Sequence, residues 1–273
     1  MKWLKTKVLL LLLLWQGASF ALPDIPSFAD CPDIIHNAGF QQQSQPSSGV
    51  GGNYPGAYTN QITVNNTART YYSYIPSQYS PNKAWPLLMV LHGAASPGQT
   101  AQAALFMRNF WQATAEQYQM IVVAPVASGS QGWIPGTDSA IWAAILGEME
   151  SDYNIEVARY YGWGFSAGGH VGHWFYLLNS DYFAAYAVNA GVLAAYAGLA
   201  YPSNANRKIP VLEMVGTTDT LYPNTLNDQT AFLNAGWQAG KTYQLETFSG
   251  GHVLNNDAPE KVAQFLCDKS IYD

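Results

Sequence analysis

A serine between two glycines, in the segment 164–168, is the feature that most restricts how this chain can fold. The segment reads Gly-Phe-Ser-Ala-Gly. A β-rich run precedes it at 158–163, and residues 169–178 after it carry apolar side chains at helical spacing. In a strand–turn–helix unit of this kind, the glycines let neighbouring backbone pass close by, and the serine takes a strained conformation that raises its hydroxyl. The pattern predicts such a unit, with Ser166 as a candidate nucleophile.

Two later strand-like runs end next to the partners that a serine nucleophile requires. A serine hydroxyl is almost inert until a base takes its proton, so it needs an imidazole and a carboxylate. The apolar run 209–215 leads into a loop with Asp219, and the run 242–248 leads into a glycine-rich loop with His252. The order Ser166, Asp219, His252, each after a predicted strand, is the order of an α/β-hydrolase. We therefore predict these three residues as a catalytic triad.

Other acids and imidazoles fit these roles less well. Asp228 lies in a polar stretch expected to open a helix, and Asp257 lies in a turn. His36 belongs to the N-terminal extension and His92 precedes the nucleophile.

His170 and His173 lie on the helix expected after the serine. No glutamate or third ligand accompanies this pair at zinc-like spacing, so helix packing or hydrogen bonding is favoured over a metal. The sequence implies no metal and no cofactor.

An acyl-transfer site also needs donors for the developing oxyanion. The continuous apolar run 85–91 is typical of a buried parallel strand, and it is followed by His-Gly-Ala. We expect the backbone amides of Ala94 and Ala167 to be these donors. Among the many aromatic residues, Trp133 and Tyr222 are the predicted substrate contacts.

These segments resemble the secreted α/β-hydrolases that include feruloyl esterases and polyhydroxybutyrate depolymerase-like esterases. The likeness extends from about Thr59 to Phe265. It rests on the segments 69–76, 86–93, 138–155, 164–169, 216–223 and 251–252. It implies the α/β-hydrolase fold, the triad named above and an ester substrate. The loop after His92 departs from the group because it lacks the cysteine that is common there.

Length and composition favour one catalytic domain. The 273 residues are 48% hydrophobic, and strand and helix signals alternate, which predicts an α/β fold with a mainly parallel sheet, helices on both faces and a small or absent lid. A helix is predicted over 100–118, with Ala103, Phe106, Met107, Phe110, Trp111 and Thr114 on one face. We expect a signal peptide at 1–21, an extension with a Gln/Ser/Gly-rich loop at 22–58, and the catalytic domain at 59–273.

The expected signal peptide combines early lysines, a short apolar run and small residues before position 22. Its removal leaves nine basic and eighteen acidic residues. Such an acidic protein is a poor partner for nucleic acid or an anionic membrane, and we expect a monomer that is secreted or periplasmic. Two cysteines remain, Cys31 and Cys267, which in an oxidising compartment favours a disulfide between them.

Taken together, the residues predict a secreted serine esterase that works through an acyl-enzyme on feruloyl-type, short-chain or hydroxyalkanoate esters, small or polymeric. A serine peptidase with the same triad and a non-catalytic carbohydrate- or surface-binding homologue are the open alternatives.

Overall fold

The computed structural model describes residues 46–196 and 201–272. The predicted signal peptide and Cys31 lie outside the described residues, as does most of the predicted extension. Within the described part, no helix is long and apolar enough to cross a membrane.

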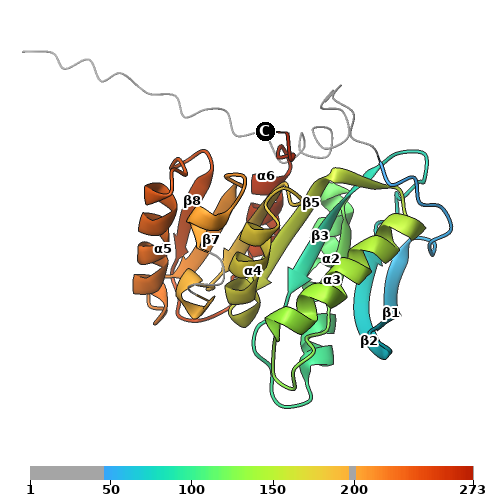
Figure 1. The fold of residues 1–273 in the computed structure, drawn as a ribbon, viewed down its shortest axis with the longest axis horizontal. Coiled ribbons are helices and arrows are strands. Elements are labelled where there is room, and N and C mark those ends of the chain that lie inside the picture. Colours follow the sequence, from blue (N-terminus) through green and yellow to red (C-terminus); the bar gives the residue numbers. More distant parts are fainter. Residues whose placement is uncertain (1–45, 197–200, 273) are drawn as a thin grey trace, which may run out of the picture.

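An eight-stranded sheet forms the centre of the fold (Figure 1). Its order is β1-β2-β4-β3-β5-β6-β7-β8. The pairs β1–β2 and β2–β4 are antiparallel, and all the others are parallel. The strands are β1 (Gly56–Val64), β2 (Thr67–Ile75), β3 (Trp85–Leu91), β4 (Ile121–Pro125), β5 (Ile155–Phe165), β6 (Ala185–Asn189), β7 (Val211–Gly216) and β8 (Tyr243–Phe248).

Helices cover both faces of this sheet (Figure 1). Buried side chains of α3 (Pro135–Asp152), α4 (Ala167–Leu178) and α5 (Tyr222–Asn234) join the core on one face. Those of α2 (Thr100–Tyr118) and α6 (Ala258–Leu266) join the core on the other. Two short 3-10 helices, η1 (Leu193–Tyr196) and η2 (Pro202–Asn204), lie between β6 and β7. The predicted α/β architecture, a mainly parallel sheet with helices on both faces, is confirmed.

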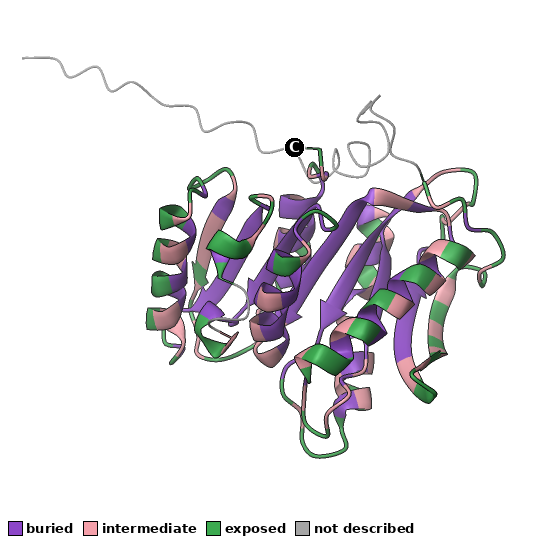
Figure 2. Cartoon of the chain, viewed as in Figure 1, coloured by how far each residue is buried: buried purple, intermediate pink, exposed green. Residues whose placement is uncertain are grey.

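The central strands are almost entirely buried because both of their faces are covered (Figure 2). In β3 all seven residues are buried. Successive side chains alternate between the two cores, as a period of two requires: Leu87 and Met89 join one core, and Leu88 and Val90 join the other.

The predicted helix 100–118 is confirmed with the same bounds, but its buried face is partly different. Met107 and Trp111 are buried as expected. Phe106 is 54% exposed, whereas Ala104 and Ala115 are buried in its place. The small alanines let the helix approach the sheet, and this turns the larger Phe106 outward.

Candidate active site

The predicted turn at 164–168 joins β5 directly to α4, and Ser166 is its strained residue. Ser166 has φ 50° and ψ −118°, a positive φ that a residue with a side chain rarely adopts. A Cβ at Gly164 would lie 2.3 Å from the carbonyl oxygen of Gly168, and one at Gly168 would lie 2.2 Å from the carbonyl oxygen of Leu91. These two positions therefore have no room for a side chain, which explains the glycines on either side of the serine.

The structure brings Ser166, His252 and Asp219 into one hydrogen-bonded line. The Ser166 hydroxyl lies 2.8 Å from Nε2 of His252, and Nδ1 of His252 lies 2.9 Å from Oδ2 of Asp219. A carboxylate only accepts hydrogen bonds, so Nδ1 carries the proton that Asp219 accepts. The Nε2 lone pair then faces the serine hydroxyl, which is the arrangement a general base requires.

The two partner loops follow the neighbouring parallel strands β7 and β8. Asp219 is 4% exposed, and its Oδ1 accepts a hydrogen bond of 2.8 Å from the amide of Leu221 at the start of α5. His252 lies in the loop after β8 and its side chain is 39% exposed. The acid is thus fixed in a dry position, whereas the imidazole reaches solvent and can meet a substrate.

Asn189 connects the nucleophile to the histidine loop, and sequence reasoning missed it. It ends β6 and is fully buried. Its carbonyl oxygen accepts the amide of Ser166 at 2.9 Å, and its side-chain Oδ1 accepts the amide of Asn255 at 2.9 Å. The signal available in the sequence was a lone asparagine at the end of an apolar run, which does not reveal its partners.

The loop after β3 lies directly against the nucleophile. A Cβ at Gly93 would lie 3.4 Å from the Cβ of Ser166. The amide of Ala95 already donates to the carbonyl oxygen of Gln131 at 2.8 Å, whereas Ala94 and Ala167 form none of the loop and cap backbone hydrogen bonds found among the described residues. The first amides of a helix have no partner within it, which includes Ala167. Neither amide is therefore occupied by such a bond, and their role as oxyanion donors stays a prediction.

His92 fixes the orientation of this loop from beneath. The amide of Ala127 donates to Nε2 of His92 at 3.3 Å, so the ring proton sits on Nδ1 and is donated to the carbonyl oxygen of Gly93 at 2.6 Å. In a trans peptide the carbonyl and the following amide point in opposite directions. The Ala94 amide is consequently turned away from His92. Burial lowers the pKa of His92 to about 4, which keeps the ring neutral.

The two predicted substrate contacts have different surroundings. Trp133 is 8% exposed, its indole N–H donates to the carbonyl oxygen of His92 at 2.8 Å, and its ring packs on His92. It supports the loop from the core, so this placement does not favour the predicted substrate contact. Tyr222 is half-buried at the start of α5, three residues after Asp219, and its role as a substrate contact stays a prediction.

The side chains of the rejected alternatives form no hydrogen bond with the side chains of Ser166, Asp219 or His252 among those found in the described residues. Asp228 lies within α5 and is 3% exposed, which corrects the expectation that it belongs to a polar helix start. Asp257 precedes α6 in a turn, as expected. Nδ1 of His170 accepts the amide of Val192 at 2.8 Å, and His173 is 1% exposed.

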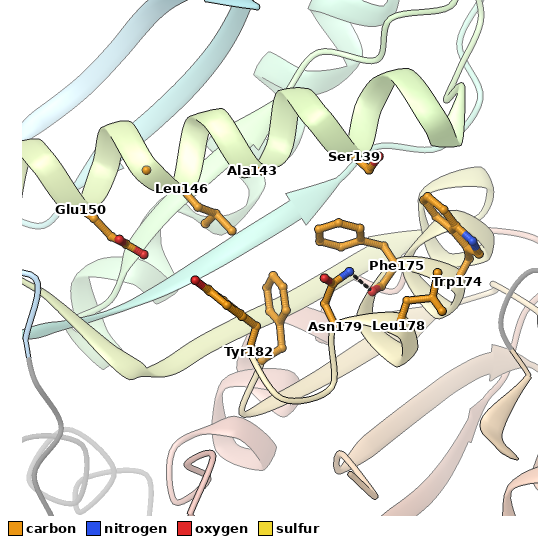
Figure 3. A pocket seen from close by; sticks show the side chains of 11 residues that line it. Ser139, Ala143, Leu146, Glu150, Trp174, Phe175, Leu178, Asn179 and Tyr182 are labelled. Carbon is orange, nitrogen blue, oxygen red and sulfur yellow. Dashed lines mark hydrogen bonds between the residues drawn. The ribbon is translucent and has the colours of Figure 1, made fainter. Parts of the chain in front are cut away.

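A cavity of about 560 Å³ lies between α3 and α4, at the end of α4 remote from Ser166 (Figure 3). Its lining includes Leu146 of α3, and Trp174, Leu178 and the nearby Tyr182. Asn179 points into the same region, where its amide donates to the carbonyl oxygen of Phe175 at 2.8 Å. This cavity is separate from the serine and its partners.

Comparisons with solved structures decide the fold. A chain from Bacteroides ovatus assigned as a dipeptidyl aminopeptidase IV superposes with a TM-score of 0.65 at 15% identity, covering 79% of this chain and 36% of that one. The ferulic acid esterase of Anaeromyces mucronatus gives 0.63 at 17% identity, covering 80% and 91%. The feruloyl esterase module of Clostridium thermocellum gives 0.57 at 16% identity, covering 83% and 92%. This chain has the α/β-hydrolase fold.

A curated relative adds a likeness in sequence. The chain is 31% identical over 161 residues to a bifunctional acetylxylan esterase/xylanase from Neocallimastix patriciarum. The match covers 55% of this chain and 21% of the relative, so the chain spans about a fifth of that protein's length. No family model matches the chain. The predicted resemblance to feruloyl esterases is confirmed by these neighbours, several of which are carboxylic ester hydrolases.

Proposed function

We propose that this chain is a serine carboxylic ester hydrolase. The observation that carries the proposal is the line of hydrogen bonds from Ser166 through His252 to Asp219. We further propose that the amides of Ala94 and Ala167 form the oxyanion site. A nucleophile, a base, an orienting acid and an oxyanion site are the four parts that acyl transfer requires.

Each part has a defined task in the proposed reaction. His252 takes the Ser166 proton as the hydroxyl oxygen attacks the ester carbonyl, and Asp219 stabilises the imidazolium that forms. The two amides stabilise the oxyanion of the tetrahedral intermediate. His252 then returns the proton to the leaving alcohol. Water, activated by the same imidazole, releases the acid from the acyl-enzyme.

The proposed substrates are soluble feruloyl-type and short-chain esters, such as acetyl esters. Two structural neighbours are feruloyl esterases, and the curated relative is an acetylxylan esterase/xylanase. The exposed face of His252 supports an open site. We expect hydroxyalkanoate polymer to be a poorer substrate, and we propose that the protein is secreted after cleavage of residues 1–21.

A hydrolysis panel tests the proposal and separates it from the peptidase alternative. The panel contains methyl ferulate, p-nitrophenyl acetate, butyrate and palmitate, acetylated xylan, polyhydroxybutyrate granules and peptide p-nitroanilides. We expect kcat/KM to be higher for butyrate than for palmitate and negligible for the anilides. Faster cleavage of anilides would assign a peptidase, and rapid granule depolymerisation would assign the polyester branch.

Ser166→Ala should lower ester kcat at least about a thousandfold, because the covalent nucleophile is lost. Ser139→Ala is the matched control and should keep full activity, because the hydroxyl of Ser139 on α3 donates to the carbonyl oxygen of Gly136 and not to His252. A Ser166→Ala protein that kept more than about a tenth of the wild-type rate would contradict the assignment of the nucleophile.

A further inference from the structure

Three ionisable side chains from different elements meet inside the apolar core on the α4 side of the sheet. They are His173 on α4, Glu213 on β7 and Asp228 on α5, exposed by 1%, 1% and 3%. One ligand atom from each lies within 4.8 Å of the others. The sequence separates these residues widely, which is why spacing alone assigns His173 to packing.

Each of the three also forms a hydrogen bond with a residue outside the cluster. Nδ1 of His173 lies 2.9 Å from the hydroxyl of Tyr186. The hydroxyl of Tyr243 donates to Oε2 of Glu213 at 2.6 Å. The amide of Leu193 donates to Oδ2 of Asp228 at 3.0 Å. This is the pattern of outer partners that orient metal ligands in proteins.

The atoms of His173 and Glu213 that face each other lack hydrogen-bond partners. Nε2 of His173 and Oε1 of Glu213 are 3.3 Å apart, yet neither forms a hydrogen bond of acceptable geometry. Both atoms are buried, and a buried polar atom left unpaired carries a substantial free-energy cost. Among the ion pairs of the described residues, no lysine or arginine faces Glu213 or Asp228. Two carboxylates therefore share a dry site without a cation from the protein.

We propose that His173, Glu213 and Asp228 bind a divalent transition-metal ion of the zinc class. One imidazole and two carboxylates form a donor set that such ions accept, and two negative charges balance one divalent ion in the core. Metal–ligand bonds of about 2.0 to 2.2 Å place neighbouring ligand atoms about 3 to 4 Å apart. The separation of 3.3 Å between His173 and Glu213 fits this range. The Asp228 oxygen lies within 4.8 Å of the other two ligand atoms and would approach them by up to about 1 Å when the ion binds.

Such an ion would stabilise the elements that position the active-site residues, and it would not contact the substrate. His173 is seven residues beyond Ser166 on α4, about 10 Å along the helix. β7 and α5 lie on either side of the loop that carries Asp219. The ion would thus connect α4, which begins next to Ser166, with β7 and α5, which flank the loop of Asp219 (Figure 1).

Metal analysis of the purified full chain tests the site. After incubation with Zn²⁺ or Co²⁺ and removal of free ion, we expect about one ion per chain. Chelation should lower the melting temperature, and re-addition of Zn²⁺ should restore it. In crystals of the zinc-loaded protein, the anomalous peak at the zinc edge should lie among the three side chains. This last measurement needs no variant.

Variants of the proposed ligands test whether the ion binds at these residues. His173→Gln and Glu213→Gln should bind less than about a tenth of the wild-type zinc. Glu148→Gln is the matched control because Glu148 also accepts a tyrosine hydroxyl, that of Tyr71 at 3.0 Å, on α3. It should bind as much zinc as the wild type.

Three results would overturn the proposal. The first is a folded wild type that retains no zinc or cobalt and melts at the same temperature with and without chelator, as expected if Glu213 shares a proton with His173 instead. The second is stoichiometric zinc in both glutamine variants. The third is an anomalous peak elsewhere on the chain.

Discussion

At the scale of single residues, the histidines of this fold differ mainly in how far each is buried. His252 is partly exposed between Ser166 and Asp219, where a base has to meet solvent and substrate. His92 is fully buried under the loop beside the nucleophile, and burial lowers its pKa to about 4. The same imidazole is thus the proposed proton acceptor at one position and a neutral structural support at the other.

The lowered pKa of His92 predicts a loss of stability in acid. Between the unfolded value of about 6.5 and the folded value of about 4, the unfolded chain binds a proton that the folded chain does not. Stability therefore falls as the pH falls through this window. From pH 7 to pH 5, His92 should contribute a loss of about 2 kcal/mol.

His92→Gln checks this contribution. Urea unfolding at pH 7 and pH 5 should show a smaller acid loss in the variant than in the wild type, by about that 2 kcal/mol. His170 and His173 titrate in both proteins and cancel in the comparison. Equal losses of stability between pH 7 and pH 5 in the two proteins would contradict a buried, neutral His92 in the folded protein.

Residue roles that depend on order along the chain were predictable, and those that depend on packing were not. Ser166, Asp219 and His252 each follow a strand, so topology alone brings them to one edge of the sheet. The burial of Trp133 depends on contacts with distant segments. The link from Asn189 to Asn255 spans 66 positions, and no local pattern encodes it.

At the scale of elements, the join between β5 and α4 is defined by steric exclusion. Gly164→Ala would place a methyl group 2.3 Å from the carbonyl oxygen of Gly168 and should prevent the correct fold, seen as loss of soluble protein or of a cooperative melting transition. The obstacle is the backbone of Gly168 and Gly169 in the first turn of α4, which cannot move without displacing Ser166.

Gly147→Ala on α3 is the matched control for that substitution. Its new methyl group meets open space, and the position is an exposed helix interior. Alanine should therefore stabilise the protein by about 0.5 to 1 kcal/mol, measured by urea unfolding. If Gly164→Ala melted like Gly147→Ala, the close packing around the turn would be refuted.

Element prediction succeeded where the chain is buried on two faces or regularly amphipathic. The strand at 85–91 and the helix at 100–118 have the predicted bounds. β1 went unpredicted because its burial alternates between half-buried and exposed residues, which leaves a weak apolar signal. The cluster of Glu213, His173 and Asp228 was also missed, since its members come from three elements that meet only in the folded chain.

At the scale of the whole molecule, we predict a disulfide between Cys31 and Cys267, which joins the N-terminal extension to the end of the catalytic domain. Cys267 is buried at the end of α6, and Cys31 lies outside the described residues, so the pairing of the two stays a prediction. A link across about 235 positions removes conformational freedom mainly from the unfolded chain. In the chain-entropy model it should stabilise the protein by about 3 to 5 kcal/mol.

Intact mass after alkylation decides the pairing. The unreduced, denatured protein should gain no alkyl group, and the reduced protein should gain two, one for each cysteine. The double variant Cys31→Ser/Cys267→Ser should unfold at lower urea than the wild type, and addition of a reductant should bring the wild type toward the same midpoint while leaving the variant unchanged. Because the triad lies on β5, β7 and β8 and their loops, the variant should keep its ester activity under conditions in which it stays folded. Two alkyl groups on the unreduced wild type would show free thiols and refute the link.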